Sequence, residues 1–428
     1  MCVVAEGHFS RVVSIFGAAG WIWLKLDPLQ DEAITAMEVD LTRGGLEPTW
    51  CLEGQEIEVF AASVRRFYER NAPAEVTERW RRQHVVDRDF WFKAADAGLL
   101  GVSVPEAYGG GGGDFRHEVA ILEAQGHFGA EAFGISLHNP VVIPYISCFG
   151  TEEQKQRWLP GLCSGELVGS IAMTEPGAGS DLRGIRTLAR PANDGYSISG
   201  QKTFISNGQT TNLIVLAAKI GETASDAQGI SLFVIETDKV TGFERGRVLD
   251  KIGQEGQDTS ELFFNEVKLP KENLLGGIEG RGFAQLTEQL AQERLVIAWQ
   301  SQSMAERAYS VAVKYSKERA LFGRMLGDFQ NTQFVLAECK TDVSVAKVFL
   351  NHCTDLLLRG QLSPVKAAMA KYWISEMQAK VIDRCLQLFG GYGYVNDFPI
   401  ARMYKDSRIH QIYGGTTEVM KHLIARSI

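Results

Sequence analysis

The sequence predicts an α+β protein in which a helical region, a β region and a second helical region follow one another. Hydrophobic residues recur with a helical period in residues 55–168, with a period of two in residues 169–280, and with a helical period again in residues 281–428. A chain of 428 residues can also form two or three domains around a large buried core. We therefore expect three domains with these boundaries, preceded by an N-terminal extension, residues 1–54, that follows no such pattern.

In the first region apolar residues recur at helical intervals, and glycines mark where the helical pattern ends. In VFAASVRRFYERN the apolar residues stand at helical intervals: Val59, Phe60, Val64 and Phe67. FWFKAADAGLLGV, residues 90–102, ends near the kind of glycine that commonly closes a helix. The five glycines of YGGGGGD, residues 108–114, interrupt the pattern. They fit either a flexible connection or a ligand-binding loop.

The second and third regions differ in the length and period of their apolar runs. Short β-rich runs, each bounded by Gly, Asn, Asp or Pro, are YSISGQKTFIS, NLIVLAA, ISLFVIE and SELFFNEVKL. Strands this short and closely spaced favour a β-sandwich or barrel. From residue 283 onward two long helical patterns return, over residues 283–320 and 363–391.

Composition and charge exclude several classes of function. The chain is 45% hydrophobic and 22% charged, which is ordinary for a globular protein, and its net charge of -8 gives no basic footprint for nucleic acid. Seven scattered cysteines without a C-x-x-C pair indicate a reducing compartment, the cytoplasm or a mitochondrial matrix. Its eight histidines form no ligand spacing typical of zinc, so we expect no metal site.

One N-terminal segment raises the question of a membrane. VVSIFGAAGWIWL, residues 12–24, is shorter than the ~20 apolar residues of a spanning helix. Its length suits the apolar core of a signal peptide, but no A-x-A-like cleavage site follows. We expect no membrane span. Met37 offers an alternative start, so the sequence leaves open whether residues 1–36 belong to the native protein.

A polar loop rich in glycine leaves the first strand of the β region. In IAMTEPGAGSDL, residues 171–182, the glycines allow close backbone approach to a ligand, and Thr174, Ser180 and Asp181 offer hydrogen-bonding groups. Taken alone, this loop is equally a plain turn. Four further motifs follow it in order: GQKTFISNG (200–208), ERALFGRMLGDFQ (318–330), QLFGGYGY (387–394) and IYGGTTEVMK (412–421). Together the five resemble the acyl-CoA dehydrogenase family, from about residue 55 to the end.

The resemblance implies a fold and a reaction. It implies an N-terminal helical domain, a middle β-sandwich or barrel and a C-terminal four-helix bundle, assembled as a homo-oligomer, most often a tetramer. It also implies noncovalent FAD, an acyl-CoA substrate oxidised to the trans-2-enoyl-CoA, and an electron-transfer flavoprotein as electron acceptor. The chain contains no G-x-G-x-x-G fingerprint or P-loop, which agrees with a dinucleotide held in a different way.

The resemblance also assigns roles to individual residues. The first two motifs would line the flavin with Met173, Thr174, Ser180, Phe204, Ile205 and Ser206, and Ser180 would also lie near the CoA moiety. The third and fourth motifs would reach the FAD of a neighbouring subunit with Arg319, Gln330, Gln387, Leu388, Gly390 and Gly391. Thr416 and Glu418 would complete the flavin contacts. Without the motif, Arg319 could equally be a solvated charge at a helix end.

The catalytic base is missing from its commonest place in the family, which is the position of Gly414. The long-chain and isovaleryl members resemble each other in carrying it on an earlier helix, directly before an arginine, as Glu293 and Arg294 stand here. The residues themselves support this choice, because Glu293 interrupts a helical stripe whose other members are Leu286, Leu290 and Ile297. Burial there would raise its pKa toward that of a general base. The alternative is an ion pair with Arg294 or a lysine.

Gly414 is consistent with a relocated base. Two carboxylates aimed at one α-carbon would repel each other, and a glycine would leave room for a wide or branched acyl chain. The resemblance implies that the backbone N–H at this position polarises the thioester carbonyl. We therefore expect Arg294, Tyr413, Gly414 and Ser180 to contact a substrate with a long or branched acyl chain.

Three other functions fit the same motifs. They are an acyl-CoA oxidase that uses oxygen, a flavin monooxygenase on this fold, and an acyl-CoA-binding protein without chemistry. Glu293 disfavours the monooxygenase, which needs no base beside the α-carbon, and retention of all flavin motifs disfavours the binding protein. Oxidases of this fold usually carry an added C-terminal domain, whereas this chain ends directly after the last motif.

Overall fold

The structure is a computed structural model that describes residues 4–5, 12–17, 20–25, 46, 49–221 and 228–428. The chain forms two compact units, Met1–Leu46 and Glu47–Ile428. The first unit contains an antiparallel sheet of three strands, β1 (Val4–Ala5), β2 (Val12–Gly17) and β3 (Gly20–Lys25). Most of the apolar segment 12–24 therefore pairs as β2 and β3. None of the helices in the described residues is long and apolar enough to cross a membrane.

The second unit begins with the predicted helical region. Its helices are α2 (Gln55–Asn71), α3 (Ala74–Gln83), α4 (Arg88–Asp96), α5 (Phe115–Phe128), α6 (Ile135–Leu137), α7 (Ile143–Phe149) and α8 (Glu152–Cys163). The apolar stripe on α2 buries Val64 and Phe67, whereas Val59 is 63% exposed and lies outside the buried face. Capping boxes at Asp114 and Thr151 satisfy the first backbone N–H groups of α5 and α8.

The glycine run between α4 and α5 forms a packed turn. The N–H groups of Gly111 and Gly112 donate to the carbonyls of Gly101 (3.1 Å) and Val104 (2.8 Å). A Cβ on Gly110 would stand 2.3 Å from the Val104 carbonyl oxygen, so only glycine permits this approach. The alternative of a flexible connection is therefore wrong, because the turn is held by backbone hydrogen bonds.

The β region forms one seven-stranded sheet. Its strands are β4 (Gly169–Ala172), β5 (Leu188–Ala192), β6 (Gly195–Ser206), β7 (Leu213–Ile220), β8 (Gln228–Glu236), β9 (Phe243–Val248) and β10 (Thr259–Pro270). Their order is β4-β7-β5-β6-β10-β9, and β8 also pairs with β7. Successive residues of β7 face two different cores: Leu213 and Val215 pack with α7 and α8, whereas Ile214 and Leu216 pack inside the curled sheet.

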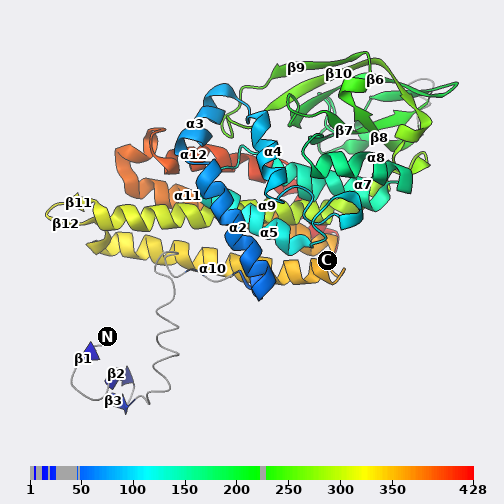
Figure 1. The fold of residues 1–428 in the computed structure, drawn as a ribbon. Coiled ribbons are helices and arrows are strands. Elements are labelled where there is room, and N and C mark those ends of the chain that lie inside the picture. The colour runs from blue at the N-terminus through cyan, green and yellow to red at the C-terminus, as the bar shows by residue number, and fades with distance from the viewer. Residues whose placement is uncertain (1–3, 6–11, 18–19, 26–45, 47–48, 222–227) are drawn as a thin grey trace. The chain divides into compact units, whose positions relative to one another are not determined.

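The C-terminal region is helical, as predicted. It contains α9 (Gly282–Glu318), α10 (Gln330–Leu358), α11 (Pro364–Phe389), α12 (Pro399–Ser407) and α13 (Thr417–Ala425). The three long helices α9, α10 and α11 lie side by side, and a hairpin of β11 (Ala320–Leu321) and β12 (Arg324–Met325) joins α9 to α10 (Figure 1). The shorter α12 and α13 both pack on α11, and α5 lies along α9.

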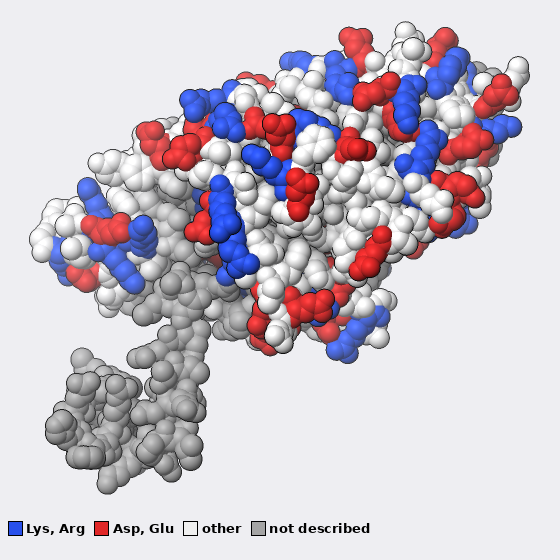
Figure 2. Space-filling view, viewed as in Figure 1, with Lys and Arg blue, Asp and Glu red and all other residues white. Residues whose placement is uncertain are grey.

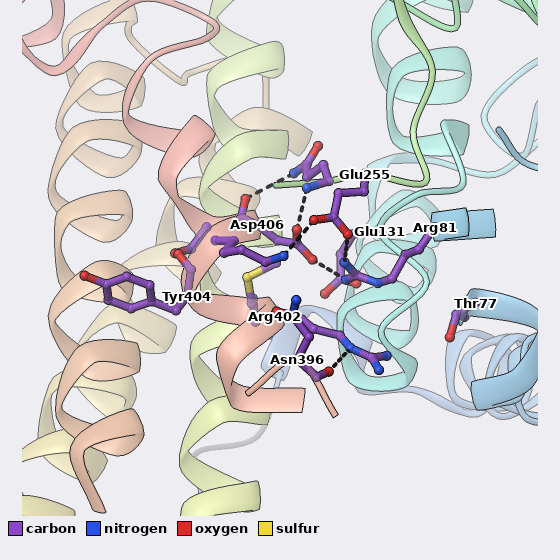
Figure 3. Close-up of polar contacts among 12 residues, drawn as sticks. Thr77, Arg81, Glu131, Glu255, Asn396, Arg402, Tyr404 and Asp406 are labelled. Carbon is purple, nitrogen blue, oxygen red and sulfur yellow. Dashed lines mark hydrogen bonds and ion pairs between the residues drawn. The ribbon is translucent and has the colours of Figure 1, made fainter. Parts of the chain in front are cut away.

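A cluster of charged side chains ties α3 and α12 to the loop between β9 and β10. The Arg81 guanidinium bonds to the Asp406 carboxylate and lies 3.6 Å from Glu255, whose carboxylate also accepts from Lys405 at 2.7 Å. Figure 3 shows Arg81, Glu255 and Asp406 converging on one point. The Gln254 backbone N–H donates to Asp406, so the cluster holds this loop in place.

One buried carboxylate in the helical core has no cation beside it in the described residues. Glu118 of α5 accepts hydrogen bonds from the Ser103 hydroxyl (3.0 Å) and the Asn139 amide (3.4 Å). Burial raises the pKa of Glu118 to about 8, and the two hydrogen bonds lower it only in part. Glu118 is therefore mostly protonated at neutral pH. Over the face seen in Figure 2, charges of both signs are interspersed, without a basic footprint.

Candidate active site

Glu293 lies inside the second compact unit, on α9, and is only 6% exposed. Its Oε1 accepts a hydrogen bond of 2.6 Å from the hydroxyl of Tyr145, a fully buried residue of α7. Burial raises the pKa of Glu293 to about 7, although the Tyr145 hydrogen bond and the positive charge of Arg294 lower it in part. A carboxylate with this pKa is suited to act as a general base near neutral pH.

The apolar stripe that Glu293 interrupts in the sequence is present on α9. Leu286 and Ile297 are buried and Leu290 is half-buried. Glu293 forms no ion pair with any residue that the structure describes, so the alternative of a structural salt bridge is not found. Arg294 is 6% exposed, and its Nε has no hydrogen-bond partner within the described part of the chain.

Gly414 faces the same side of α9. Its φ is +63°, and a Cβ at this position would stand 2.2 Å from Cδ1 of Ile297, one turn after Glu293. The expectation that glycine leaves this space open for an acyl chain is therefore wrong at the Cβ position, which Ile297 fills. No described residue accepts a hydrogen bond from the Gly414 N–H. The Tyr413 hydroxyl donates to Oε1 of Gln300 at 3.2 Å, still on this face of α9.

The first two motifs lie against each other. The Thr203 N–H donates to the Thr174 carbonyl at 3.0 Å, and Nζ of Lys202 donates to the Met173 carbonyl at 2.9 Å. Lys202 is fully buried and forms an ion pair of 2.8 Å with Glu175. Burial lowers the pKa of Lys202 to about 8, and Glu175 offsets this in part. This pair, which sequence reasoning missed, locks the loop onto β6.

The loop and β6 present different side chains to solvent. Phe204 is 67% exposed with a left-handed backbone (φ +59°), whereas Ile205 is buried and Ser206 is half-buried. Ser180 is exposed on the loop. A few residues later the guanidinium of Arg183 lies 4.9 Å over the ring of Phe283, in the first turn of α9. This contact places the end of the first motif beside the N-terminal turn of α9, about 15 Å of helix before Glu293.

The third and fourth motifs lie at the opposite end of α9. The Arg319 guanidinium lies 5.7 Å over the Tyr392 ring, which brings these two motifs together. About 26 residues separate Glu293 from Arg319, or about 39 Å of helix at 1.5 Å per residue. Exposed residues of this group are Arg319, Gln330, Gln387, Gly390 and Gly391, with Leu388 half-buried. One chain therefore does not bring Arg319 and Glu293 into one site.

The last motif begins α13. The Thr416 side chain caps the helix by accepting from the Val419 N–H at 3.3 Å, and Glu418 lies exposed in the first turn. A backbone N–H and the Thr416 hydroxyl hold the pKa of Glu418 below its usual range. Nζ of Lys371 on α11 donates to the Gly415 carbonyl at 2.6 Å and fixes the turn in front of this helix.

Comparison with known proteins identifies the family of the chain. Three family models match consecutive parts of the chain: the acyl-CoA dehydrogenase N-terminal domain (residues 54–166), middle domain (170–267) and C-terminal domain (280–428). The long-chain specific acyl-CoA dehydrogenase, mitochondrial, of Mus musculus is 43% identical over 374 residues, which cover 87% of this chain and 86% of that protein.

Solved structures show the same similarity. The crystal structure of acyl-CoA dehydrogenase from Geobacillus kaustophilus matches with a TM-score of 0.84 and 44% identity, over 88% of this chain and 98% of that one. A structure described as the electron transferring flavoprotein of Acidaminococcus fermentans matches with a TM-score of 0.82 and 36% identity, over 86% and 97% of the two chains. Family models match most of the chain, and relatives are similar over nearly all of their length. The chain therefore belongs to the acyl-CoA dehydrogenase family of oxidoreductases.

Proposed function

We propose that this protein removes the α and β hydrogens of an acyl-CoA thioester to form the trans-2-enoyl-CoA, with Glu293 as the general base. The observation that carries the proposal is the buried carboxylate of Glu293 on the face of α9 that Gly414 approaches. Its raised pKa lets it exist as a base near neutral pH and still bind a proton. The ion-pair partner that would keep it permanently charged is missing from the described residues.

The residues of the motifs fit FAD. Phe204 exposes an aromatic ring from a strained backbone beside Met173 and Thr174. A Cβ added at Gly390 or Gly391 would have no other atom within 4 Å, so a ligand can approach the backbone of these residues. Arg319 has no acidic partner among the described residues, and its planar guanidinium suits pyrophosphate oxygens. When bound, FAD supplies the acceptor for the hydride that leaves the β-carbon.

Each protein group then has one task at the substrate. Glu293 takes the α-proton, and the electrons of that C–H bond pass toward the thioester carbonyl. The Gly414 N–H, which no described residue engages, donates to the carbonyl oxygen where negative charge develops. Tyr413, tied to Gln300, lines the same face. Apolar packing around Leu286 and Ile297 excludes water from the base.

We also propose that two chains complete each cofactor site within a homotetramer. The support is the ~39 Å of helix between Glu293 and Arg319, which is too far for both to serve one FAD from the same chain. Exposed apolar side chains at the Arg319 end, such as Phe322 (88%) and Tyr394 (91%), suit burial against another copy.

The proposed electron acceptor is an electron-transfer flavoprotein, and the proposed substrate has a long or branched acyl chain. The similarity to a structure described as an electron transferring flavoprotein supports the first. The placement of Glu293 before Arg294, together with the 43% identity to a long-chain specific enzyme, supports the second.

An anaerobic titration tests the proposal. The purified protein is mixed with acyl-CoAs of increasing chain length, and bleaching of the flavin absorbance measures reduction. Glu293→Gln preserves shape but removes the basic oxygen, so the reduction rate should fall by at least the ~10²–10⁴-fold attributed to general bases, while acyl-CoA still binds. Glu288→Gln, an exposed glutamate on the same helix, is the matched control and should behave as wild type.

Each other outcome identifies a different function. Normal flavin reduction in Glu293→Gln contradicts the assigned base. Bound flavin that no acyl-CoA bleaches would indicate the non-catalytic binding protein. Fast reoxidation of the reduced protein by oxygen, without need for an electron-transfer flavoprotein, would indicate the oxidase.

A further inference from the structure

We propose that Tyr145 is a positioning residue for the base, holding the Glu293 carboxylate ionised and turned toward the substrate through one buried hydrogen bond. The inference rests on the proposed function, because it assigns a partner to the base named there. It concerns a tyrosine of α7, outside all five motifs, and a contact that spans 148 positions of the sequence.

The geometry allows Tyr145 to direct the carboxylate. Its hydroxyl donates to Oε1 of Glu293 at 2.6 Å, which is the length of a hydrogen bond to an ionised acceptor. Within the described part of the chain Oε2 makes no hydrogen bond, so one oxygen is anchored and the other is left to take a proton. A glutamate has three rotatable bonds, and anchoring one oxygen removes rotational freedom that a base would otherwise lose at each turnover.

Tyr145 is itself fixed and can only donate. Tyr145 is fully buried, and the centre of its ring lies 6.2 Å from that of the Phe149 ring. Burial together with the Glu293 charge raises the pKa of Tyr145 well above its usual value. Tyr145 therefore keeps its proton wherever Glu293 is ionised. Among the residues that the structure describes, the charged group that acts on Glu293 is Arg294 on α9, and Lys371 on α11 in turn lies near Arg294.

The hydrogen bond favours the ionised form of Glu293, so its removal should raise the pKa of the base. Tyr145→Phe keeps the ring and deletes the donor. A hydrogen bond to a charged group corresponds to a shift of about one to two pH units. In stopped-flow reduction with a saturating acyl-CoA, the acidic limb should therefore move upward from about pH 7 by that amount. The rate at pH 7 should fall about five- to fiftyfold and recover toward pH 9.

Tyr68→Phe is the matched control. Tyr68 is fully buried, and its hydroxyl has no hydrogen-bond partner among the residues described. Its pH profile should coincide with that of wild type. A second readout uses no turnover: the infrared band of the protonated carboxyl, identified by its loss in Glu293→Gln, should titrate at higher pH in Tyr145→Phe than in wild type or Tyr68→Phe.

The results separate this inference from the proposed function. If Glu293→Gln reduces flavin normally, the base assignment fails. If Glu293→Gln is inactive but Tyr145→Phe keeps the wild-type acidic limb and infrared titration, only the positioning role is overturned. A rate lowered equally at every pH would likewise overturn it, because this would be damage to the pocket without an effect on ionisation.

Discussion

Moving the carboxylate from position 293 to position 414 tests whether a carboxylate at either position can reach the same α-carbon of the substrate. The change is Glu293→Ala with Gly414→Glu. The structure shows two costs at position 414: a non-glycine residue at φ +63° costs about 1–2 kcal/mol, and the new Cβ would meet Cδ1 of Ile297 at 2.2 Å. Overpacking of this kind costs about 1–3 kcal/mol.

Ile297→Val removes the clashing atom, since the next atom of that side chain lies 3.7 Å from the built Cβ. In the wild-type background this substitution should destabilise the protein by about 0.5–1.5 kcal/mol, as for other buried Ile→Val changes. In the background of the moved carboxylate it should instead stabilise it by about 1 kcal/mol, because relief of the contact exceeds the lost packing. The sign of the effect of Ile297→Val should therefore reverse between the two backgrounds.

Two measurements check this. Urea unfolding gives the free energies, and anaerobic stopped flow gives the rate of flavin reduction. Glu293→Ala alone should slow reduction at least ~10²–10⁴-fold, the moved carboxylate should recover part of the rate, and adding Ile297→Val should recover more. If Ile297→Val destabilises both backgrounds equally, the packing argument at Gly414 is refuted. If the triple variant binds flavin and acyl-CoA but recovers no rate, position 414 does not address the same α-carbon.

Three further predictions concern stability and cofactor retention. Arg81→Met leaves the buried Asp406 carboxylate without its ion pair and should cost about 3–5 kcal/mol of unfolding free energy, whereas Arg79→Met at the surface should cost less than about 1 kcal/mol. The raised pKa of Glu118 contributes stability that is present below its unfolded pKa and is lost as pH rises through about 8. The free energy of unfolding of the wild type should therefore fall by about 5 kcal/mol between pH 4 and 9 through this group, and Glu118→Gln should not show this fall. Arg319→Ala should keep the fold but lose FAD during gel filtration, because the binding free energy of FAD should weaken by about 1.5–3 kcal/mol.

Much of the architecture could be predicted because it depends on local periodicity. The change from a helical period to a period of two marks the position of β4, and the stripe on α9 supports the choice of Glu293, which the family resemblance identifies. The pattern was less reliable at its edges. Val59 fits the helical spacing of α2, yet it lies at the solvent side of that helix.

The partners of the site residues could not be predicted, because they come from distant parts of the chain. No spacing rule connects Tyr145 to Glu293, and Lys202 stands in an alternating strand where a lysine normally faces water. At Gly414 the sequence shows that a side chain is missing but not that Ile297 occupies the space. Tyr145 stands in the short helix α7, whose sequence IPYISCF carries no pattern that would mark the tyrosine as a partner of Glu293.

The length of α9 has a consequence for mixtures of defective chains. If the two ends of α9 serve two different cofactors, Glu293→Gln and Arg319→Ala affect different cofactor sites of the same helix. A dimer built from one chain of each kind would pair the intact Glu293 of the Arg319→Ala chain with the intact Arg319 of the Glu293→Gln chain, and would place both defects in the other site. Two inactive proteins, co-expressed, would then restore activity that neither has alone. A helix that spans two sites makes the pair of chains, rather than the single chain, the unit on which a mutation acts.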